Sequence, residues 1–193
     1  MSARRDEIVA LARKLFAEQG YVSTSMRDIA DASGLLPGSL YTHFASKAKL
    51  VGEIVSGFYA ELLTVQKEAM ASPGTGADRL RRMFRATYAV CETHPEELTI
   101  LHYDWKSLSA LEETTEVRTL GVRTLDMWRK VVKAGIADGT LTPAISPELA
   151  TRLITSAIHA ALDPVRYRDL PASKKPNAAQ QLEDVLLGGL LAR

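Results

Sequence analysis

The chain has 193 residues, of which 46% are hydrophobic, so it can form one domain or a small domain joined to a larger one, with a sizeable core. Its net charge is only +1: residues 1–50 carry seven basic and five acidic side chains, and the remainder carries 17 basic and 18 acidic ones. A generally basic protein is therefore excluded, and any binding to nucleic acid must depend on a local patch.

Several functional classes are also excluded by missing motifs. No window is apolar enough to span a membrane, and the first seven residues lack the apolar core of a signal peptide, so we expect a cytoplasmic protein without membrane contact. The chain has no Gly-x-Ser-x-Gly elbow, no Walker loop, no His-Glu-x-x-His pair and no Cys-x-x-Cys pair. We expect no enzyme activity, no cofactor and no metal.

Cys91, the single cysteine, is expected to be a buried thiol, with redox sensing as the lesser alternative.

Residues 4–19 are predicted to form the first helix. Ile8, Leu11, Leu15 and Phe16 recur at the spacing of one helical face, and Gly20 ends the pattern. This face is the expected lid for the apolar side chains that follow.

The segment from Thr24 to Leu50 predicts two short helices joined by a tight turn, followed by the start of a third. Ser25 precedes the first of them, and Asp28 stands three residues later, which is the capping-box spacing. Gly34 can close this helix in the left-handed conformation, and Pro37 suits the first turn of the next. The segment therefore has the pattern of a helix-turn-helix.

The helix that begins at Pro37 has one apolar side, with Leu40 and Phe44, and one side of small hydrogen-bonding residues that suits a major groove. Ser46 is expected to cap the following helix. Lysine at the start of that helix opposes the helix dipole, and a DNA phosphate would resolve the conflict. We expect Tyr41 and Lys47 to contact phosphate and Ser39 and Thr42 to contact base edges. The full set of predicted DNA contacts is Thr24, Ser25, Arg27, Pro37, Ser39, Tyr41, Thr42, His43 and Lys47.

The remaining chain also reads as helical, without useful strand-like alternation, so the expected fold is all-α. Residues 1–50 are predicted to form a three-helix DNA-binding domain, and residues 51–193 a second, larger helical domain. A helix over residues 47–71 is expected to connect the two parts. The further helices expected in the second part span residues 77–93, 95–105, 112–138, 147 onward and 178–191, with a proline-containing loop before the last.

The helix-turn-helix segment resembles the DNA-binding domain of TetR-family transcriptional regulators. The matching residues are Gly20-Tyr21, Thr24 through Ala30, Gly34, Gly38 through Tyr41, His43-Phe44, Ser46-Lys47 and Leu50. Leu36 and Pro37 depart from the family, which commonly has a hydroxyl cap and a lysine there. The resemblance implies a homodimer that binds palindromic operator DNA and is released by a small-molecule effector held among the central helices. Residues 51–193 are therefore expected to form a helical ligand-binding and dimerisation domain.

The last two helices carry apolar stripes, and the final helix of a chain has little left to pack on. A two-fold partner would supply the missing surface, as in a four-helix interface. The predicted interface residues are Leu153, Ile154, Ile158, Leu182, Val185, Leu186 and Leu190.

The resemblance also implies an effector pocket, for which the central helices offer aromatic, flexible and a few polar side chains. The predicted lining residues are Phe84, Tyr88, His102, Trp105, Arg123, Met127 and Trp128. The runs GSLYTHFASK, MWRKVVKAGIADGTL and VLLGGLL are similar to actinobacterial TetR-type repressors of steroid and fatty-acid catabolism, which implies an acyl-CoA effector. Two alternatives remain: a DNA-bound activator, and a helical adapter that responds to a protein partner without a small ligand.

Overall fold

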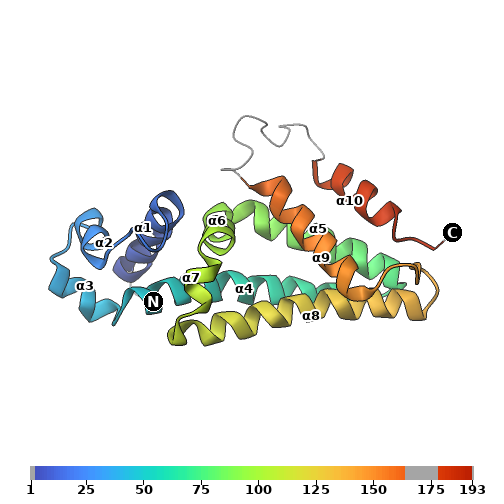
Figure 1. Ribbon diagram of the computed structural model, residues 1–193, viewed down its shortest axis with the longest axis horizontal. Helices are drawn as coiled ribbons and strands as arrows, with labels where there is room; N and C mark the ends of the chain where they lie inside the picture. The colour runs from blue at the N-terminus through green and yellow to red at the C-terminus, as the bar shows by residue number, and fades with distance from the viewer. Residues whose placement is uncertain (1–2, 164–177, 193) are drawn as a thin grey trace. The chain divides into compact units, whose positions relative to one another are not determined.

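The computed structural model describes residues 3–163 and 178–192, and these residues form an all-α fold, as predicted (Figure 1). The predicted loop with Pro164, Pro171 and Pro176 lies outside the described residues. Within them, no helix is long and apolar enough to cross a membrane. The elements are α1 (Ala3–Gln19), α2 (Met26–Ala32), α3 (Pro37–His43), α4 (Lys47–Ala71), α5 (Gly76–Thr93), α6 (Pro95–Tyr103), α7 (Trp105–Ser109), the 3₁₀ helix η1 (Glu112–Thr114), α8 (Thr115–Ala137), α9 (Pro147–Leu162) and α10 (Ala178–Gly188).

The chain divides into two compact units. Unit 1 comprises Met1–Tyr59 and Glu96–Leu120, and unit 2 comprises Ala60–Pro95 and Gly121–Arg193. The first part of α4 belongs to unit 1 and its second part to unit 2, and α8 is divided in the same way. These compact units do not test the predicted boundary between two functional domains after residue 50, because unit 1 also contains most of α6, α7 and η1.

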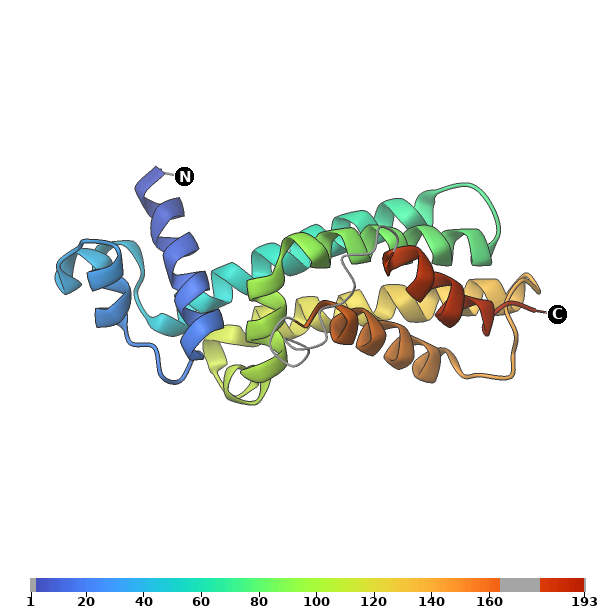
Figure 2. The ribbon, with the colours of Figure 1, turned by 90° about the horizontal axis from the view of Figure 1, so that it is seen from above.

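Unit 1 is built around the apolar face of α1. Ile8 and Phe16 are fully buried, and Leu40 of α3 and Phe44 just after it are buried as well, which is the lid arrangement that the spacing predicted. Helix α1 packs on α2, and α2 packs on α3 (Figure 2). Two helices of seven residues are too short to be stable alone, so this shared core holds the helix-turn-helix together.

Unit 2 has a close contact between two glycines. A Cβ atom on Gly76, the first residue of α5, would lie 2.2 Å from the Cα atom of Gly135 in α8. The α5 end is tied further by Asp138, whose Oδ2 accepts from the Gly76 amide at 2.6 Å, and by Thr140, whose hydroxyl oxygen accepts from the Ala77 amide at 3.1 Å. Backbone contact this close requires glycine.

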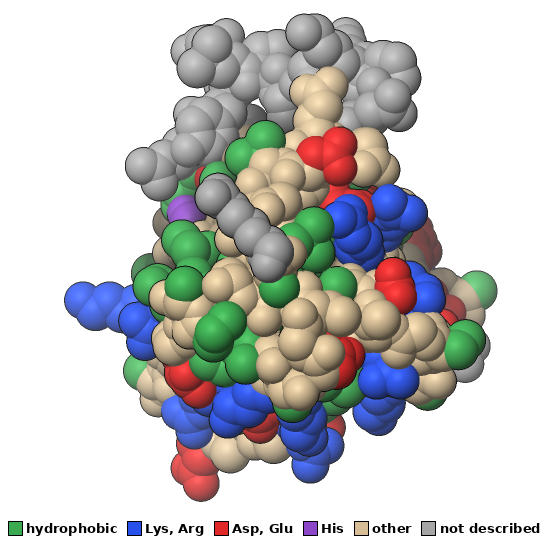
Figure 3. Space-filling model, turned by 90° about the vertical axis from the view of Figure 1, so that its right-hand side faces the viewer, with side chains coloured by type: hydrophobic (Ala, Val, Ile, Leu, Met, Phe, Trp, Pro, Cys, Tyr) green, Lys and Arg blue, Asp and Glu red, His purple; other side chains and the backbone are tan. Residues whose placement is uncertain are grey.

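Helix α10 lies against α5 and α9 and is held by a buried acid (Figure 1). The Glu183 side chain is fully buried, and its carboxylate pairs with Arg81 at 3.1 Å and with Arg85 at 2.6 Å, both from α5. On the face shown in Figure 3, hydrophobic side chains gather on the left and Lys and Arg side chains lie along the lower edge.

Helix α10 ends at Gly188, three residues before the predicted end at Leu191. The glycine pair 188–189 is a poor helix former, and the following backbone pairs with another segment instead. The Thr142 amide donates to the Leu190 carbonyl at 2.9 Å, and Leu141 and Leu191 form an isolated antiparallel bridge.

Two other predicted helices are interrupted. The segment 95–105 forms α6 and the beginning of α7, with Asp104 between them. The segment 112–138 forms η1 and α8, and the Thr114 hydroxyl in η1 donates to the Leu108 carbonyl in α7 at 2.5 Å. Gly139, with a φ of +76°, follows the end of α8, as expected.

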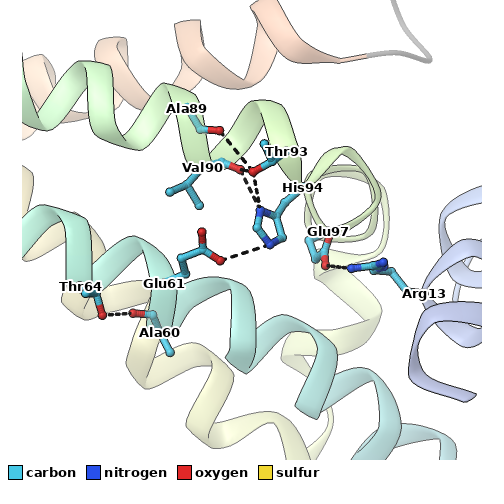
Figure 4. A network of polar contacts seen from close by, with 9 residues as sticks. All are labelled: Arg13, Ala60, Glu61, Thr64, Ala89, Val90, Thr93, His94 and Glu97. Atoms are coloured by element: carbon cyan, nitrogen blue, oxygen red, sulfur yellow. Dashed lines mark hydrogen bonds and ion pairs between the residues drawn. The ribbon is translucent and has the colours of Figure 1, made fainter. Parts of the chain in front are cut away.

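In unit 2, α5 ends at a histidine that contacts α4. His94 Nδ1 lies 2.9 Å from the Val90 carbonyl, and His94 Nε2 lies 3.4 Å from the carboxylate of Glu61 in α4 (Figure 4). The imidazole therefore connects the C-terminal end of α5 to α4.

Candidate DNA-binding site

The helix-turn-helix begins with a reciprocal capping box, as the sequence predicted. The Ser25 side-chain oxygen accepts from the Asp28 amide at 3.2 Å, and Asp28 Oδ2 accepts from the Ser25 amide at 2.7 Å. The hydrogen bonds from Ser25 to the carboxylate hold the pKa of Asp28 below its ordinary value. Gly34 has a φ of +64°, so the turn after α2 uses the left-handed conformation.

Helix α3 presents most of the predicted contact residues to solvent. Leu40 is fully buried, whereas Pro37, Ser39, Tyr41 and Thr42 are exposed. The Thr42 hydroxyl donates to the Ser39 carbonyl at 2.7 Å, so its proton is used within the helix, and its methyl group and lone pairs remain for a partner. Two further predicted residues, Ser25 and Arg27, are exposed near α2, and His43 is half-buried.

Thr24 was predicted to contact DNA, but the structure places its side chain inside unit 1. It is 1% exposed, and its hydroxyl donates to the Gly20 carbonyl at 2.9 Å. The hydroxyl therefore closes the turn between α1 and α2. A short hydroxyl side chain with a local carbonyl partner is favoured in such a turn, and this competes with an outward role.

Lys47 was predicted to contact phosphate, but its ammonium group has other partners in the structure. Nζ donates to the carbonyls of Tyr21 and Thr24, each at 2.7 Å, and lies 4.3 Å from the centre of the Tyr21 ring. Desolvation by burial lowers the pKa of Lys47. Backbone carbonyls therefore supply the negative partner for which the sequence pattern predicts a DNA phosphate.

The turn between α1 and α2 also binds the residue that separates α6 from α7. The Tyr21 amide donates to Asp104 Oδ2 at 2.9 Å, and Asp104 lies between α6 and α7. A second link, between α1 and α6, joins Arg13 to Glu97 at 3.1 Å, and the Glu97 side chain is almost completely buried (Figure 4). Sequence reasoning missed Asp104 and Glu97 as partners of the DNA-binding segment, because they lie more than 80 positions away from it.

Two arginines of α1 bind to other parts of unit 1. Arg4 donates to Glu7 and to the Ser33 carbonyl at the end of α2. The Arg5 guanidinium lies 4.5 Å from the centre of the Phe44 ring and pairs with Glu53 of α4. Both side chains therefore hold the helix-turn-helix in place.

Comparison with known proteins identifies the family. Residues 8–54 match the model described as bacterial regulatory proteins of the tetR family, and residues 73–162 match the tetracyclin repressor-like C-terminal domain. The chain belongs to the TetR family. Its members are DNA-binding transcriptional regulators and not enzymes.

The relatives of this TetR-family chain include repressors. It is 35% identical over 190 residues to the transcriptional repressor KstR2 of Rhodococcus jostii, covering 98% of this chain and 92% of that protein. The structure of KstR2 of Mycobacterium tuberculosis matches with a TM-score of 0.86 and 30% identity, covering 100% of this chain and 97% of that one. AibR, at 18% identity, shares the fold with a TM-score of 0.78 over 96% of each chain.

The predicted effector residues fall in both units of this TetR-family chain. Phe84, Tyr88 and Trp128 are buried in unit 2, and the Phe84 and Tyr88 rings are stacked with centres 6.2 Å apart. In the same unit Met127 is half-buried and Arg123 is exposed. The other two predicted residues, His102 and Trp105, are exposed on unit 1.

Unit 2 also contains buried polar atoms that sequence reasoning missed. Gln66 Oε1 in α4, Thr87 Oγ1 in α5 and Thr151 Oγ1 in α9 are buried without a hydrogen-bond partner. Such atoms are costly unless water or a ligand satisfies them. Across residues 3–163 and 178–192, no three His, Cys, Asp or Glu side chains gather in a way that would hold a metal ion.

The predicted dimer residues separate into two groups. Ile154, Ile158 and Leu190 are buried inside unit 2 and belong to its core. Leu153 and Val185 are 50% and 77% exposed, and Leu182 and Leu186 are half-buried. Helix α9 has apolar residues on two faces, and the sequence pattern could not tell which face packs internally.

Proposed function

We propose that this chain is a ligand-responsive transcriptional repressor that binds palindromic operator DNA as a homodimer and is released by a small-molecule effector. The observation that carries the DNA-binding part is the outward face of α3, where Ser39, Tyr41 and Thr42 are exposed while Leu40 is buried. A DNA-binding role would place the protein in the cytoplasm with the chromosome.

The proposed DNA contacts are the predicted residues that remain accessible. Tyr41 would donate to a phosphate, and Ser39 would hydrogen-bond to a base edge. Thr42 would use its methyl group and its lone pairs, because its proton is bound to the Ser39 carbonyl. Ser25, Arg27, Pro37 and His43 complete the set.

The proposed dimer uses the exposed apolar side chains of α9 and α10. Leu149 is 49% exposed and lies four residues before Leu153 on α9, and Val185 is the most exposed of the large hydrophobic residues on α10. Residues four apart share a helix face, so Leu149 and Leu153 form an exposed apolar pair on α9. A two-fold axis through such a surface would give a dimer with two DNA-binding segments, which a palindromic operator requires.

The proposed effector is an acyl-CoA thioester that binds in unit 2. The buried aromatic residues Phe84, Tyr88 and Trp128 would contact its acyl part, and Gln66, Thr87 and Thr151 offer unsatisfied polar atoms for a carbonyl or hydroxyl group. The exposed Arg123 is proposed for the CoA phosphates. Met127 is proposed as a flexible lining residue. For His102 and Trp105, which are in unit 1, contact with the effector remains a prediction.

Two similar proteins have names or titles that mention small molecules. KstR2 of M. tuberculosis is described as a ketosteroid transcriptional regulator, and AibR was solved with isovaleryl coenzyme A and operator DNA. Release requires that the effector bind the DNA-free state more tightly than the DNA-bound state, because equal affinity for both shifts nothing.

A fluorescence anisotropy titration with a selected operator tests the release. The duplex-bound protein is titrated with acyl-CoA thioesters of increasing acyl size, and free CoA and the free acids serve as controls. Release by one thioester at concentrations where neither part acts alone supports the proposal. Unchanged binding across the panel contradicts the acyl-CoA assignment and leaves the DNA-binding assignment intact.

A further inference from the structure

The residue before α3 is an unusual one for the start of a helix. Leu36 is the N-cap of α3, where Ser, Thr, Asp or Asn would accept from an unpaired amide, and its side chain makes no capping hydrogen bond. The side chain is 78% exposed, the highest exposure among the large hydrophobic residues in the described chain. Leu36 therefore gives up the capping function without contributing to the core.

The backbone fixes where this side chain stands. Leu36 has a φ of −67° and a ψ of 144°, the extended conformation that a following proline favours. Its carbonyl accepts from the Ser39 amide at 2.9 Å and from the Leu40 amide at 3.3 Å, so the residue is anchored to the first turn of α3. The leucine is thus presented from a fixed point.

Three consecutive residues at this end of α3 have no side-chain hydrogen-bond donor or acceptor. They are Leu36, Pro37 and Gly38, and both Pro37 and Gly38 are exposed. A Cβ atom on Gly38 would meet nothing within 4 Å, so no other part of the described chain occupies the space there. The first side-chain hydroxyl in α3 is that of Ser39.

These features limit what this end of α3 can recognise. The N-terminal residues of a recognition helix approach base edges in the major groove. The one apolar group that base edges present there is the C5-methyl group of thymine. Building on the DNA-binding function proposed above, we infer that Leu36 is a specificity-determining residue that contacts a thymine methyl group in each half-site of the operator.

A double-mutant cycle between protein and DNA tests this inference. The operator selected by the wild-type protein is prepared with each symmetric pair of thymines replaced by deoxyuridine, which removes only the methyl group. Affinities of wild-type protein and of Leu36→Ala are measured for each duplex. At one thymine pair, wild-type affinity should fall about fourfold per methyl group, or about fifteenfold for both half-sites, and Leu36→Ala should not respond.

Val22 provides a matched control, because it is also in unit 1 and is 69% exposed but lies in the turn before α2. Val22→Ala should keep the full sensitivity to deoxyuridine. Leu36→Ser, which restores a capping hydroxyl, should fold normally and lose that sensitivity.

The outcomes separate the two proposals. If deoxyuridine weakens wild-type protein and Leu36→Ala equally at every thymine, or has no effect at any thymine, the Leu36 assignment is wrong while DNA recognition stands. If folded wild-type protein selects no sequence, DNA recognition fails, and the Leu36 assignment fails with it.

Discussion

The ammonium nitrogen of Lys47 lies 2.7 Å from the carbonyl oxygen of Tyr21, and the amide of the same tyrosine donates to Asp104 at 2.9 Å. Lys47 begins α4, and Asp104 lies between α6 and α7. Tyr21, in the turn that leads into α2, is therefore bound by two different parts of unit 1. Its carbonyl binds the start of α4, and its amide binds the residue between α6 and α7. Because the pairs are charge-assisted, a displacement of either partner would move this turn.

Replacement of Lys47 separates a positioning role from a phosphate contact. In Lys47→Met the carbonyls of Tyr21 and Thr24 lose their donor, so stability should fall by about 1–3 kcal/mol and DNA affinity should fall with it. The salt dependence of binding should keep its slope, because no phosphate contact is removed. Thermal unfolding and anisotropy at several salt concentrations measure both effects.

Lys49→Met is the control, since Lys49 is exposed two residues further along. This variant should keep its stability, and any phosphate contact of Lys49 would appear as a salt slope lower by about 1. An unchanged melting temperature with a shallower salt slope in Lys47→Met would show instead that Lys47 binds phosphate.

The contact of Gly76 with Gly135 predicts a sharp difference between two glycines. In Gly76→Ala the new methyl group would overlap the backbone of α8, so unfolding free energy should fall by about 1–3 kcal/mol or more. Gly57 is exposed within α4, and a Cβ atom there would meet nothing within 4 Å. In Gly57→Ala the unfolding free energy should therefore rise by about 0.5–1 kcal/mol. Urea denaturation measures both, and equal stability of the two variants would rule out the close helix contact.

The buried Glu183 predicts a link between α10 and subunit assembly. Glu183→Gln removes the charge that pairs with Arg81 and Arg85 and should cost about 1–3 kcal/mol, because both arginines retain some solvent contact. If α10 forms part of the dimer interface, the variant should also dissociate at higher protein concentration than wild type. Analytical ultracentrifugation over a dilution series measures this, with the exposed neighbour changed in Asp184→Asn as the control. A destabilised variant with unchanged dimerisation would remove α10 from the proposed interface.

Cys91 is expected to be chemically silent in the folded protein. The thiol is buried, and desolvation raises its pKa to about 12, so the reactive thiolate is scarce at neutral pH. Reaction with a thiol reagent should be slow for native protein, should speed up about tenfold per pH unit below that pKa, and should be complete in denaturant. Rapid reaction of the Cys91 thiol in native protein at pH 7 would instead support the alternative of redox sensing.

Local patterns were sufficient to predict most of the helices. The capping box of Ser25 with Asp28, the left-handed Gly34 and the start of α3 at Pro37 all depend on neighbours within a few residues. The apolar spacing of α1 likewise identified the core of the helix-turn-helix.

Partners far apart in the sequence were not predictable in the same way. Nothing near Lys47 indicates that its ammonium group binds Tyr21 and Thr24, and nothing near Glu183 indicates two arginines of α5. The apolar pattern of α9 fits two faces equally, so the prediction for Ile154 placed a core residue at the surface. The end of α10 was misjudged because the chain after Gly188 pairs with residues 140–142.

The most direct test of the proposed function is selection of binding sites from random duplex DNA by the purified protein. The proposal predicts an enriched palindrome with half-sites about one helical turn apart, and loss of recovery when the active acyl-CoA thioester is present. Tyr41→Phe should recover the same motif with weaker affinity, since a phosphate contact carries no sequence information. Failure of a folded, dimeric protein to enrich any sequence would contradict the assignment of α3 as a recognition helix.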